Sequence, residues 1–203
     1  FWFAIDLDDA EGETINCTLW VSKDNVSWKW GGYQLITDNG TCNITFQGYD
    51  CSDIANNTYY KFTIEDAEPD NIQNTTEFIG PNVTKADVNL TAEIVGNNSN
   101  ISRTYDTKIL AFRVHDLDSD TYPSGVNGSI WVTVNGTDFN SYSNQTNGTG
   151  YLVISFSPGC NSPRYYVGEQ KWFGGVYDDS CYEEVNHTQN YTVNIFGTQK
   201  QNI

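Results

Sequence analysis

Apolar and polar residues alternate over short stretches along most of the chain, which is the pattern of half-buried β-strands. From Ile15 to Val21, every second residue of "INCTLWV" is apolar, and "VNGSIWV" from Val126 repeats the arrangement. Turns rich in Gly, Asn and Asp separate such stretches, and no 3.6-residue period of useful length occurs. The pattern predicts an all-β protein built from short strands.

The chain repeats itself at an offset of about 110 residues. The matches "NCTLWVS" with "NGSIWVT" and "NGTCNITF" with "NGTGYLVISF" follow in the same order in both halves, as do two acidic "DLD" turns. Each half has the number and spacing of strands typical of a β-sandwich of about 100 residues. We therefore predict two tandem immunoglobulin-like or fibronectin-III-like domains, residues 1–82 and 83–203.

The second copy has a segment that the first copy lacks. Val88, Leu90, Ala92 and Ile94 alternate ahead of "ILAFRVHDLD", as an edge strand A would, whereas nothing in the sequence precedes "FWFAIDLDD". Aligning the acidic turns places Phe1, Phe3 and Ile5 on the strand face of Ala111, Arg113 and His115, so the first domain is apolar where the second is polar. We therefore expect the first sandwich to lack strand A.

An open groove beside a core strand is a hazard that proteins cover, and a strand from another copy is one cover. A head-to-tail contact of this kind generates filaments. The predicted subunit interface contains Phe1, Trp2, Phe3 and Ile5, and the donor is either the C-terminal "YTVNIFGTQKQNI" or Phe1–Leu7 itself. The alternative is that an upstream strand was cleaved or not included, or that the first domain is a shorter variant.

Acceptor sequons for N-glycosylation, Asn-x-Ser/Thr without Pro, are dense in both halves. The chain contains sixteen, a number that favours an exported, sugar-coated protein over incidental matches. Their asparagines are Asn16, Asn25, Asn39, Asn43, Asn56, Asn74, Asn82, Asn89, Asn97, Asn100, Asn127, Asn135, Asn144, Asn147, Asn186 and Asn190. We predict covalent N-glycans at these positions.

Two sequon asparagines, Asn16 and Asn127, share a strand face with the tryptophans four residues later, Trp20 and Trp131. Either the indole packs into the core, or an attached sugar stacks on it. Because large aromatic side chains are usually buried, we favour the core position.

Five cysteines without a CxxC pair favour local disulfides in an oxidising compartment over a zinc site. Cys42 and Cys51 lie close in sequence, as do Cys160 and Cys181, so we predict that each pair closes a loop. Cys17 remains, and its alternation with Leu19 predicts a buried free thiol.

The formal charge of −16 excludes the basic footprint of a nucleic-acid-binding protein. No run of eighteen apolar residues is present, so we predict no membrane span, and we expect any signal peptide to have been removed.

The acidic turns bring carboxylates together, as calcium loops do. Asp6 and Asp8, with Asp9 and Glu11 nearby, form one such group, and the second group contains Asp116 and Asp118. The spacing does not fit an EF-hand, and ordinary Asx turns explain the same residues. Calcium is the one cofactor that the sequence indicates, and none is required.

Catalytic motifs are lacking, so we predict that the protein is not an enzyme. Its histidines are His115 and His187, and the carboxylates of "YDDSCYEE" are best explained as a solvated loop. If the protein has a binding role, the best candidate is the stretch "RYYVGEQKWFGGVYDD", in which Tyr165, Tyr166, Trp172 and Phe173 would contact sugars or a cell surface.

The stretch "IDLDDAEGETINCTLWVSKDNVSW" resembles immunoglobulin-like and fibronectin-III-like repeats of archaeal cell-surface proteins. The second copy departs from it, with "DLDSDTYPSG" and "NGTDF" where the first has Gly12 and Trp28. Such modules occur in S-layer proteins, adhesins and extracellular filaments, and the dense sequons are similar to those of glycosylated, donor-strand-linked, thread-like pili. The resemblance implies an extracellular structural subunit that polymerises with copies of itself. An S-layer or adhesin domain that binds carbohydrate or a cell surface is the alternative.

Overall fold

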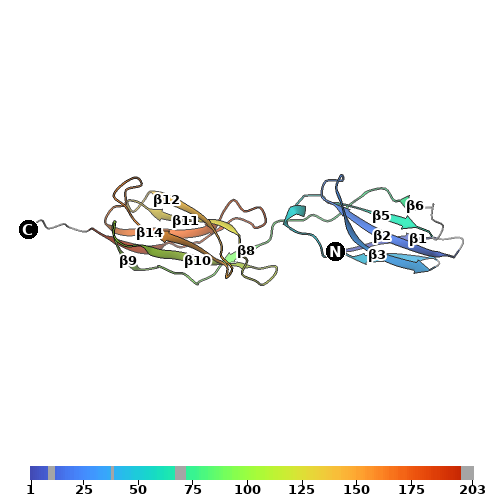
Figure 1. Cartoon of the computed structure of the whole chain (residues 1–203), viewed down its shortest axis with the longest axis horizontal. Helices are drawn as coiled ribbons and strands as arrows, with labels where there is room; N and C mark the ends of the chain where they lie inside the picture. The colour runs from blue at the N-terminus through green and yellow to red at the C-terminus, as the bar shows by residue number, and fades with distance from the viewer. Residues whose placement is uncertain (9–11, 38, 67–71, 198–203) are drawn as a thin grey trace, which may run out of the picture. The chain divides into compact units, whose positions relative to one another are not determined.

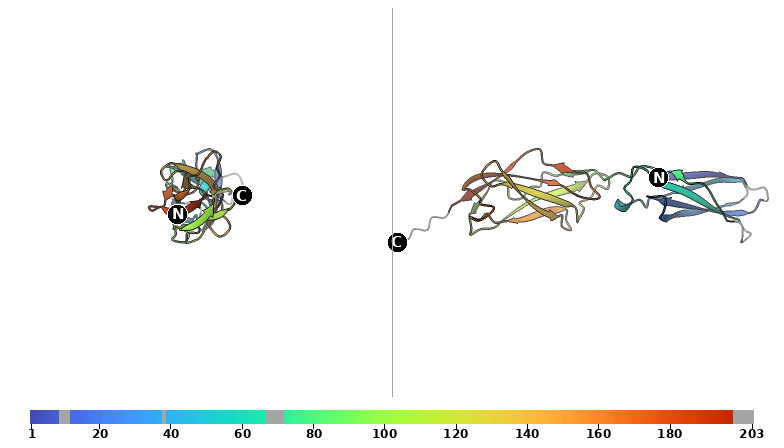
Figure 2. Two further views of the ribbon diagram at one scale, coloured as in Figure 1. Left: turned by 90° about the vertical axis from the view of Figure 1, so that its left-hand side faces the viewer. Right: turned by 90° about the horizontal axis from the view of Figure 1, so that it is seen from above.

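The computed structural model describes residues 1–8, 12–37, 39–66 and 72–197, and almost all of its regular structure is β-sheet. The chain divides into two compact units, Phe1–Lys85 and Ala86–Ile203, whereas the sequence places the boundary between residues 82 and 83. Figures 1 and 2 show the strands of each unit packed in layers. The all-β prediction is confirmed, and each unit is a β-sandwich. Within the described ranges, no helix has the length and apolar character that crossing a membrane requires.

The first unit packs a two-stranded sheet against a five-stranded one. Its strands are β1 (Trp2–Leu7), β2 (Thr14–Ser22), β3 (Trp28–Thr37), β4 (Gly40–Thr45), β5 (Tyr59–Glu65), β6 (Ile72–Asn74) and β7 (Phe78–Ile79), with the 3-10 helix η1 (Cys51–Asp53) after β4. β1 pairs with β4, and the larger sheet has the order β3-β2-β5-β6, with β7 also paired to β5. Alternation along β2 places Cys17, Leu19 and Val21 in the core.

The second unit has more strands in both sheets. They are β8 (Val88–Leu90), β9 (Ser99–Ser102), β10 (Lys108–Asp116), β11 (Asn127–Thr133), β12 (Phe139–Gln145), β13 (Tyr151–Phe156), β14 (Gly168–Val176), β15 (Val185–Asn186) and β16 (Tyr191–Phe196). One sheet has the order β13-β10-β8, and the other has the order β12-β11-β14-β16-β9, with β15 beside β14. Phe112 and Leu152 from the smaller sheet share a core with Ile130 and Trp172 from the larger one.

One contact between the sheets shows how the two units correspond. By sequence, Cys17 on β2 corresponds to Gly128 on β11. Cys17 is bonded to Cys42 of β4, and a Cβ added at Gly128 would lie 2.5 Å from a methyl carbon of Leu152 on β13. Cys42 and Leu152 therefore occupy equivalent positions, and β4 corresponds to β13.

Strand pairing extends the correspondence to β1 and β10. Ile5 lies opposite the cysteine of β4, and Phe112 lies opposite the matching leucine of β13, so Ile5 corresponds to Phe112 and Phe3 to Leu110. The alignment at the acidic turns, which placed Phe3 on the face of Arg113, is wrong. Phe3 points into the first unit, where it is 5% exposed and its ring lies 4.8 Å from that of Tyr60.

The second unit contains a strand A, divided between its two sheets. β8 pairs antiparallel with β10, Val95 forms a further bridge to Ala111, and β9 then pairs in parallel with β16. In the described part of the first unit, β1 pairs with β4 alone, and β6 and β7 pair with β5 alone. The first sandwich therefore lacks a counterpart of strand A there.

Candidate functional site

Among the residues that the structure describes, no strand pairs with the side of β1 that faces away from β4, and this side is called the β1 edge below. Phe1 and Phe46 exchange both backbone hydrogen bonds, at 2.8 and 2.9 Å. Because these bonds alternate along an antiparallel pair, the backbone groups of Trp2, Ala4 and Asp6 point away from β4. In the second unit, the residue corresponding to Ala4 is Ala111, and it exchanges both bonds with strand A, at 2.9 and 3.1 Å. The β1 edge thus presents the groups that strand A satisfies in the other copy.

Apolar side chains lie incompletely covered beside the β1 edge. Phe1 lies on the inner face of its strand and is 57% exposed, and Phe78 of β7 is 39% exposed although it shares a face with Tyr60, which packs against the core. The rings of Phe78 and Tyr60 stack with centroids 5.1 Å apart. In the second unit, strand A supplies Ile101 to the core, where it is 1% exposed. The first unit therefore leaves Phe1 and Phe78 far more exposed than the second unit leaves Ile101.

The structure separates the four residues predicted for the interface. Phe1 and Trp2 are exposed, whereas Phe3 is buried in the core of its own unit and Ile5 packs against that core. Of the two predicted donors, Phe1–Leu7 contains a strand of its own sandwich. The C-terminal segment is partly used as well, because β16 lies in the second unit, and its residues 198–203 are outside the described ranges.

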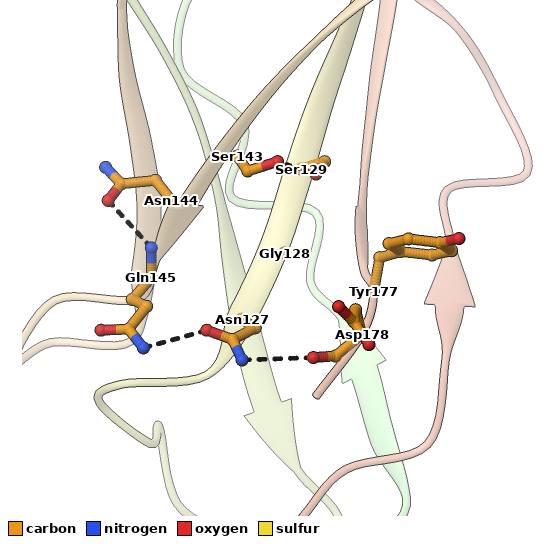
Figure 3. A pocket seen from close by; sticks show the side chains of 8 residues that line it. All are labelled: Asn127, Gly128, Ser129, Ser143, Asn144, Gln145, Tyr177 and Asp178. Atoms are coloured by element: carbon orange, nitrogen blue, oxygen red, sulfur yellow. Dashed lines mark hydrogen bonds between the residues drawn. The ribbon is translucent and has the colours of Figure 1, made fainter. Parts of the chain in front are cut away.

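Nearly all sequon asparagines are accessible. All sixteen lie in the described ranges, and fourteen are exposed, while Asn16 and Asn127 are half-buried. Asn127 lines a hollow at the start of β11, where its Nδ2 donates to the carbonyl of Asp178 and its Oδ1 accepts from Gln145 (Figure 3). The amide nitrogen of Asn16 donates to Glu65. Glycosylation is therefore sterically open at most of the predicted positions.

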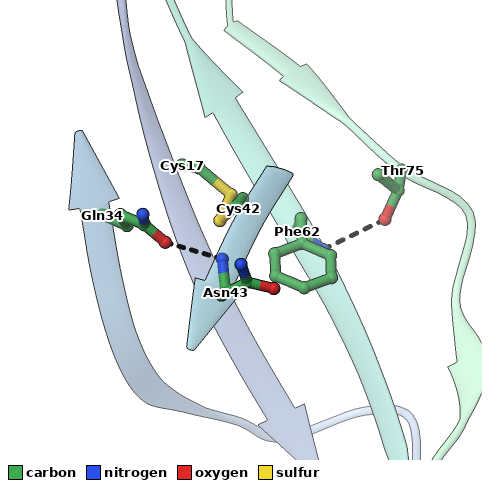
Figure 4. The surroundings of a disulfide bond; sticks show 6 residues. All are labelled: Cys17, Gln34, Cys42, Asn43, Phe62 and Thr75. Carbon is green, nitrogen blue, oxygen red and sulfur yellow. Dashed lines mark hydrogen bonds between the residues drawn. A yellow bond between two sulfur atoms is a disulfide. The ribbon is translucent and has the colours of Figure 1, made fainter. Parts of the chain in front are cut away.

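Cysteine pairing differs from the prediction. Cys17 and Cys42 form a disulfide that joins β2 to β4, and so one sheet to the other (Figure 4). Cys17 is buried as predicted but is not a free thiol, and Cys42 does not pair with Cys51. Cys160 is free and exposed, so it does not pair with Cys181. Cys51 and Cys181 are each disulfide-bonded.

Sequence proximity was the wrong signal for this disulfide, because its partners face each other across the sandwich. The correct signal was the internal repeat. Cys17 and Cys42 stand at the two positions where the second copy has a glycine and a leucine in contact.

The acidic turns serve as backbone acceptors. Oδ1 of Asp116 accepts from the N–H groups of Asp118 and Ser119, and Asp118 accepts from Asp87. Asp6 accepts from the hydroxyl of Thr41. No group of three or more His, Cys, Asp or Glu side chains that could hold a metal occurs in the described ranges, while Asp9 and Glu11 lie outside them. Calcium stays a prediction.

The carboxylates of "YDDSCYEE" include a structural acceptor. Asp179 is buried, and its oxygens accept from the backbone N–H groups of Asn127, Cys181 and Tyr182 at 2.7 to 3.1 Å. It therefore holds the loop after β14 against the start of β11. The prediction of a solvated loop is therefore wrong for Asp179, which is a buried structural acceptor.

The stretch "RYYVGEQKWFGGVYDD", predicted as a binding surface, does not form one exposed surface, and it contains strand β14. Tyr165 and Trp172 are buried, at 1% and 0% exposed, and Phe173 stacks on Trp131 with ring centroids 5.0 Å apart. Tyr166 alone among the four predicted contact residues is largely exposed. Tyr165 and Trp172 therefore cannot contact a ligand in the folded unit.

The tryptophans that follow the half-buried sequons face outward, so their predicted core position is wrong. Trp131 is covered by Phe173 of β14, its partner in the sheet. The corresponding Trp20 has Lys61 of β5 and Trp30 of β3 as its partners, and Trp30 is 60% exposed. The first unit therefore exposes indole surface that the second unit covers itself.

Comparisons with known proteins concern the fold. The sequence matches no protein-family model and no curated protein. A tetra-tandem repeat from the extending region of a large adhesion protein aligns with 95% of this chain at 9% identity and a TM-score of 0.48. This chain spans about half of that structure, 48% of its length. The D0–D1 domain of intimin aligns with 91% of this chain and 88% of its own length, at 13% identity and a TM-score of 0.34. A solved chain from a 1.5-MDa bacterial ice-binding adhesin aligns with 97% of this chain, at 12% identity and a TM-score of 0.35, and the match covers 58% of that solved chain.

Proposed function

We propose that this chain is a structural subunit of an N-glycosylated extracellular filament, in which a strand from one copy completes the first sandwich of the next. The observation that carries the proposal is the β1 edge. Ala4 presents both of its backbone groups there, whereas the corresponding Ala111 has both groups bonded to strand A. β-Augmentation satisfies such groups through main-chain bonds, and alternate side chains of the added strand fill the adjoining core.

A head-to-tail contact follows from this chemistry. The acceptor is the β1 edge and the donor is a different segment, so the contact is heterologous, and repeating it extends a filament or closes a ring. Long exposed edges are prone to uncontrolled pairing, and a dedicated donor strand removes that hazard.

Two further observations support an exterior location. The Cys17–Cys42 disulfide lies inside the first sandwich, and structural disulfides are typical of oxidising compartments. Fourteen exposed sequon asparagines offer a coat of sugar, and neither β1 nor β7 contains a sequon. Sugars attached at these sites leave β1 and β7 themselves unmodified.

Replacing Ala4 tests the proposal without touching the pairing of β1 with β4. In Ala4→Pro, proline removes one outward N–H and places its ring along the edge, which edge strands tolerate. We expect this variant to remain as single chains by size-exclusion chromatography and electron microscopy. Ala4→Val, which keeps the N–H, should assemble like the natural chain.

Near-ultraviolet circular dichroism of the unassembled material provides the folding control, since both variants should keep the native spectrum. Assembly of Ala4→Pro into normal filaments would overturn the proposal. Single chains that attach to cells or carbohydrate, in both variants and in the natural chain, would favour the adhesin alternative.

A further inference from the structure

The outer face of the larger sheet of the first unit contains a group of three indoles, called the indole platform below. It consists of Trp20 on β2 and of Trp28 and Trp30 on β3. Trp30 pairs with Trp20, so both side chains emerge on the same face. The ammonium of Lys61 lies 4.2 Å from the ring centroid of Trp28. The platform is thus aromatic, partly exposed, and bordered by a hydrogen-bond donor.

A sequon asparagine opens onto the same surface. Trp20, Trp28, Lys61, Thr63 and Asn74 line one shallow hollow. Asn74 is exposed and pairs with Thr63, whose hydroxyl donates to Asn74 Oδ1 at 2.8 Å. This bond uses the carbonyl oxygen of the amide and holds the side chain beside the hollow. The amide nitrogen, the atom to which an N-glycan is attached, remains available.

In the second unit, aromatic side chains of the same unit cover the corresponding indole, that of Trp131. At the position of Lys61, β14 has Phe173, which stacks on Trp131 at an interplanar angle of 18°. Tyr177 adds an edge contact to the same indole. In the first unit, a lysine and a sequon take the place of this aromatic cover. The difference points to a cover that is amphipathic and arrives from Asn74.

We infer that the N-glycan on Asn74 folds back across the indole platform, with sugar rings stacked on Trp20 and Trp30 and their hydroxyl groups bonded to Lys61. Pyranose rings have apolar faces that suit aromatic surfaces, and aromatic side chains favour contacts that leave polar groups at their rim. Asn74 lies two strands from Trp20, so the lateral distance is about 10 Å at the usual strand spacing. A chain of a few sugar residues spans that distance.

In this arrangement, the glycan lies on the face of the sheet and not at its edge. β6 is an edge strand, and Asn74 is its last residue. A sugar chain that lies over β5 and β2 leaves the flank of β6 clear. The inference rests on the glycosylation part of the proposed function and is independent of assembly.

The experiment is hydroxyl-radical footprinting of the chain secreted from a glycosylating host, at a concentration where chromatography shows single chains. Glycopeptide mass spectrometry first establishes which sequons carry sugar. We expect Asn74 to be occupied, and Trp20 and Trp30 to be oxidised several-fold more slowly in the natural chain than in Thr76→Ala. That substitution removes the sequon and leaves the Asn74 side chain in place.

Asn43→Gln is the matched control, because it removes a sequon from β4, in the other sheet, and should leave both oxidation rates unchanged. Equal rates in the natural chain and Thr76→Ala, or an Asn74 without sugar among occupied sequons, would overturn this inference alone. Sequons that are all empty would overturn the glycosylation part of the proposed function as well. Protection that appears only after assembly would assign the platform to a second copy.

Discussion

At the scale of single residues, the two copies solve one packing problem in different ways. Where the sheets meet, the first unit joins Cys17 to Cys42, and the second places Leu152 against Gly128. The glycine has no Cβ, so the leucine methyl takes the space that one sulfur occupies in the other copy. The described residues of the first unit contain no strand A, and a covalent link joins its two sheets.

Removing that link should mainly affect the first unit. The disulfide closes a loop of 25 residues, for which chain-entropy estimates give about 3 to 4 kcal/mol. Cys17→Ala with Cys42→Ala should lower the free energy of unfolding of the first unit by about this amount, measured by urea denaturation. The second unit, whose core contains neither residue, is the internal control. An unchanged free energy of unfolding of the first unit would contradict a stabilising role of the disulfide.

We expect a half-buried histidine, His187, to make the second unit sensitive to acid. Burial lowers the pKa of His187, and its hydrogen bond to the carbonyl of Gly174 offsets the effect only in part. Unfolded histidine titrates near 6.5. As the pH falls below about 6.5, the unfolded chain takes up a proton that the folded unit resists, so stability falls until the pH reaches the lowered folded pKa.

Thermal unfolding at several pH values between 7.5 and 5 tests this expectation. The second unit should lose stability over that range, and His187→Phe, which keeps the ring contacts to Phe112 and Tyr191 and the sequon of Asn186, should reduce the loss. The first unit contains no histidine and lacks this contribution. A slope unaffected by the substitution would assign the acid sensitivity to other groups.

At the scale of elements, the alternation of apolar and polar residues predicted strands and their inner faces, but it did not predict which strands lie side by side. The strands around Cys17 and Ile130 and their inner faces follow directly from the period of two. The residues of β1 were matched to the wrong residues of β10 because the alignment followed the acidic turns. The lengths of turns differ between the two copies, whereas the core positions correspond. The outward tryptophans were misassigned because partners on neighbouring strands, which cover Trp131, are not visible in one strand's pattern.

Hydrogen exchange should distinguish the open edge from its closed counterpart. In single chains, the amide of Ala111, bonded to Val95, should exchange slowly, whereas the amide of Ala4 should exchange much faster. Amide exchange followed by NMR resolves the two residues. The amide of Phe3, directed toward β4, is the neighbouring control and should be protected. A slow Ala4 amide in single chains would show that the edge is already covered.

At the scale of the whole molecule, three features lead to one arrangement. The chain carries a formal charge of −16, most of its sequon asparagines are exposed, and its first sandwich has an open edge without sequons on β1. Net charge and sugar oppose indiscriminate association. The β1 edge remains as the place where a specific strand can join.

Electron cryomicroscopy of the assembled native material, at a resolution that separates strands, would show whether a strand is added at the β1 edge. We predict filaments in which a strand from a neighbouring subunit lies beside β1, bonded to the backbone of Trp2, Ala4 and Asp6, with its apolar side chains between Phe1 and Phe78. A β1 edge that is bare in the assembly, or covered by a segment of its own chain, would contradict it.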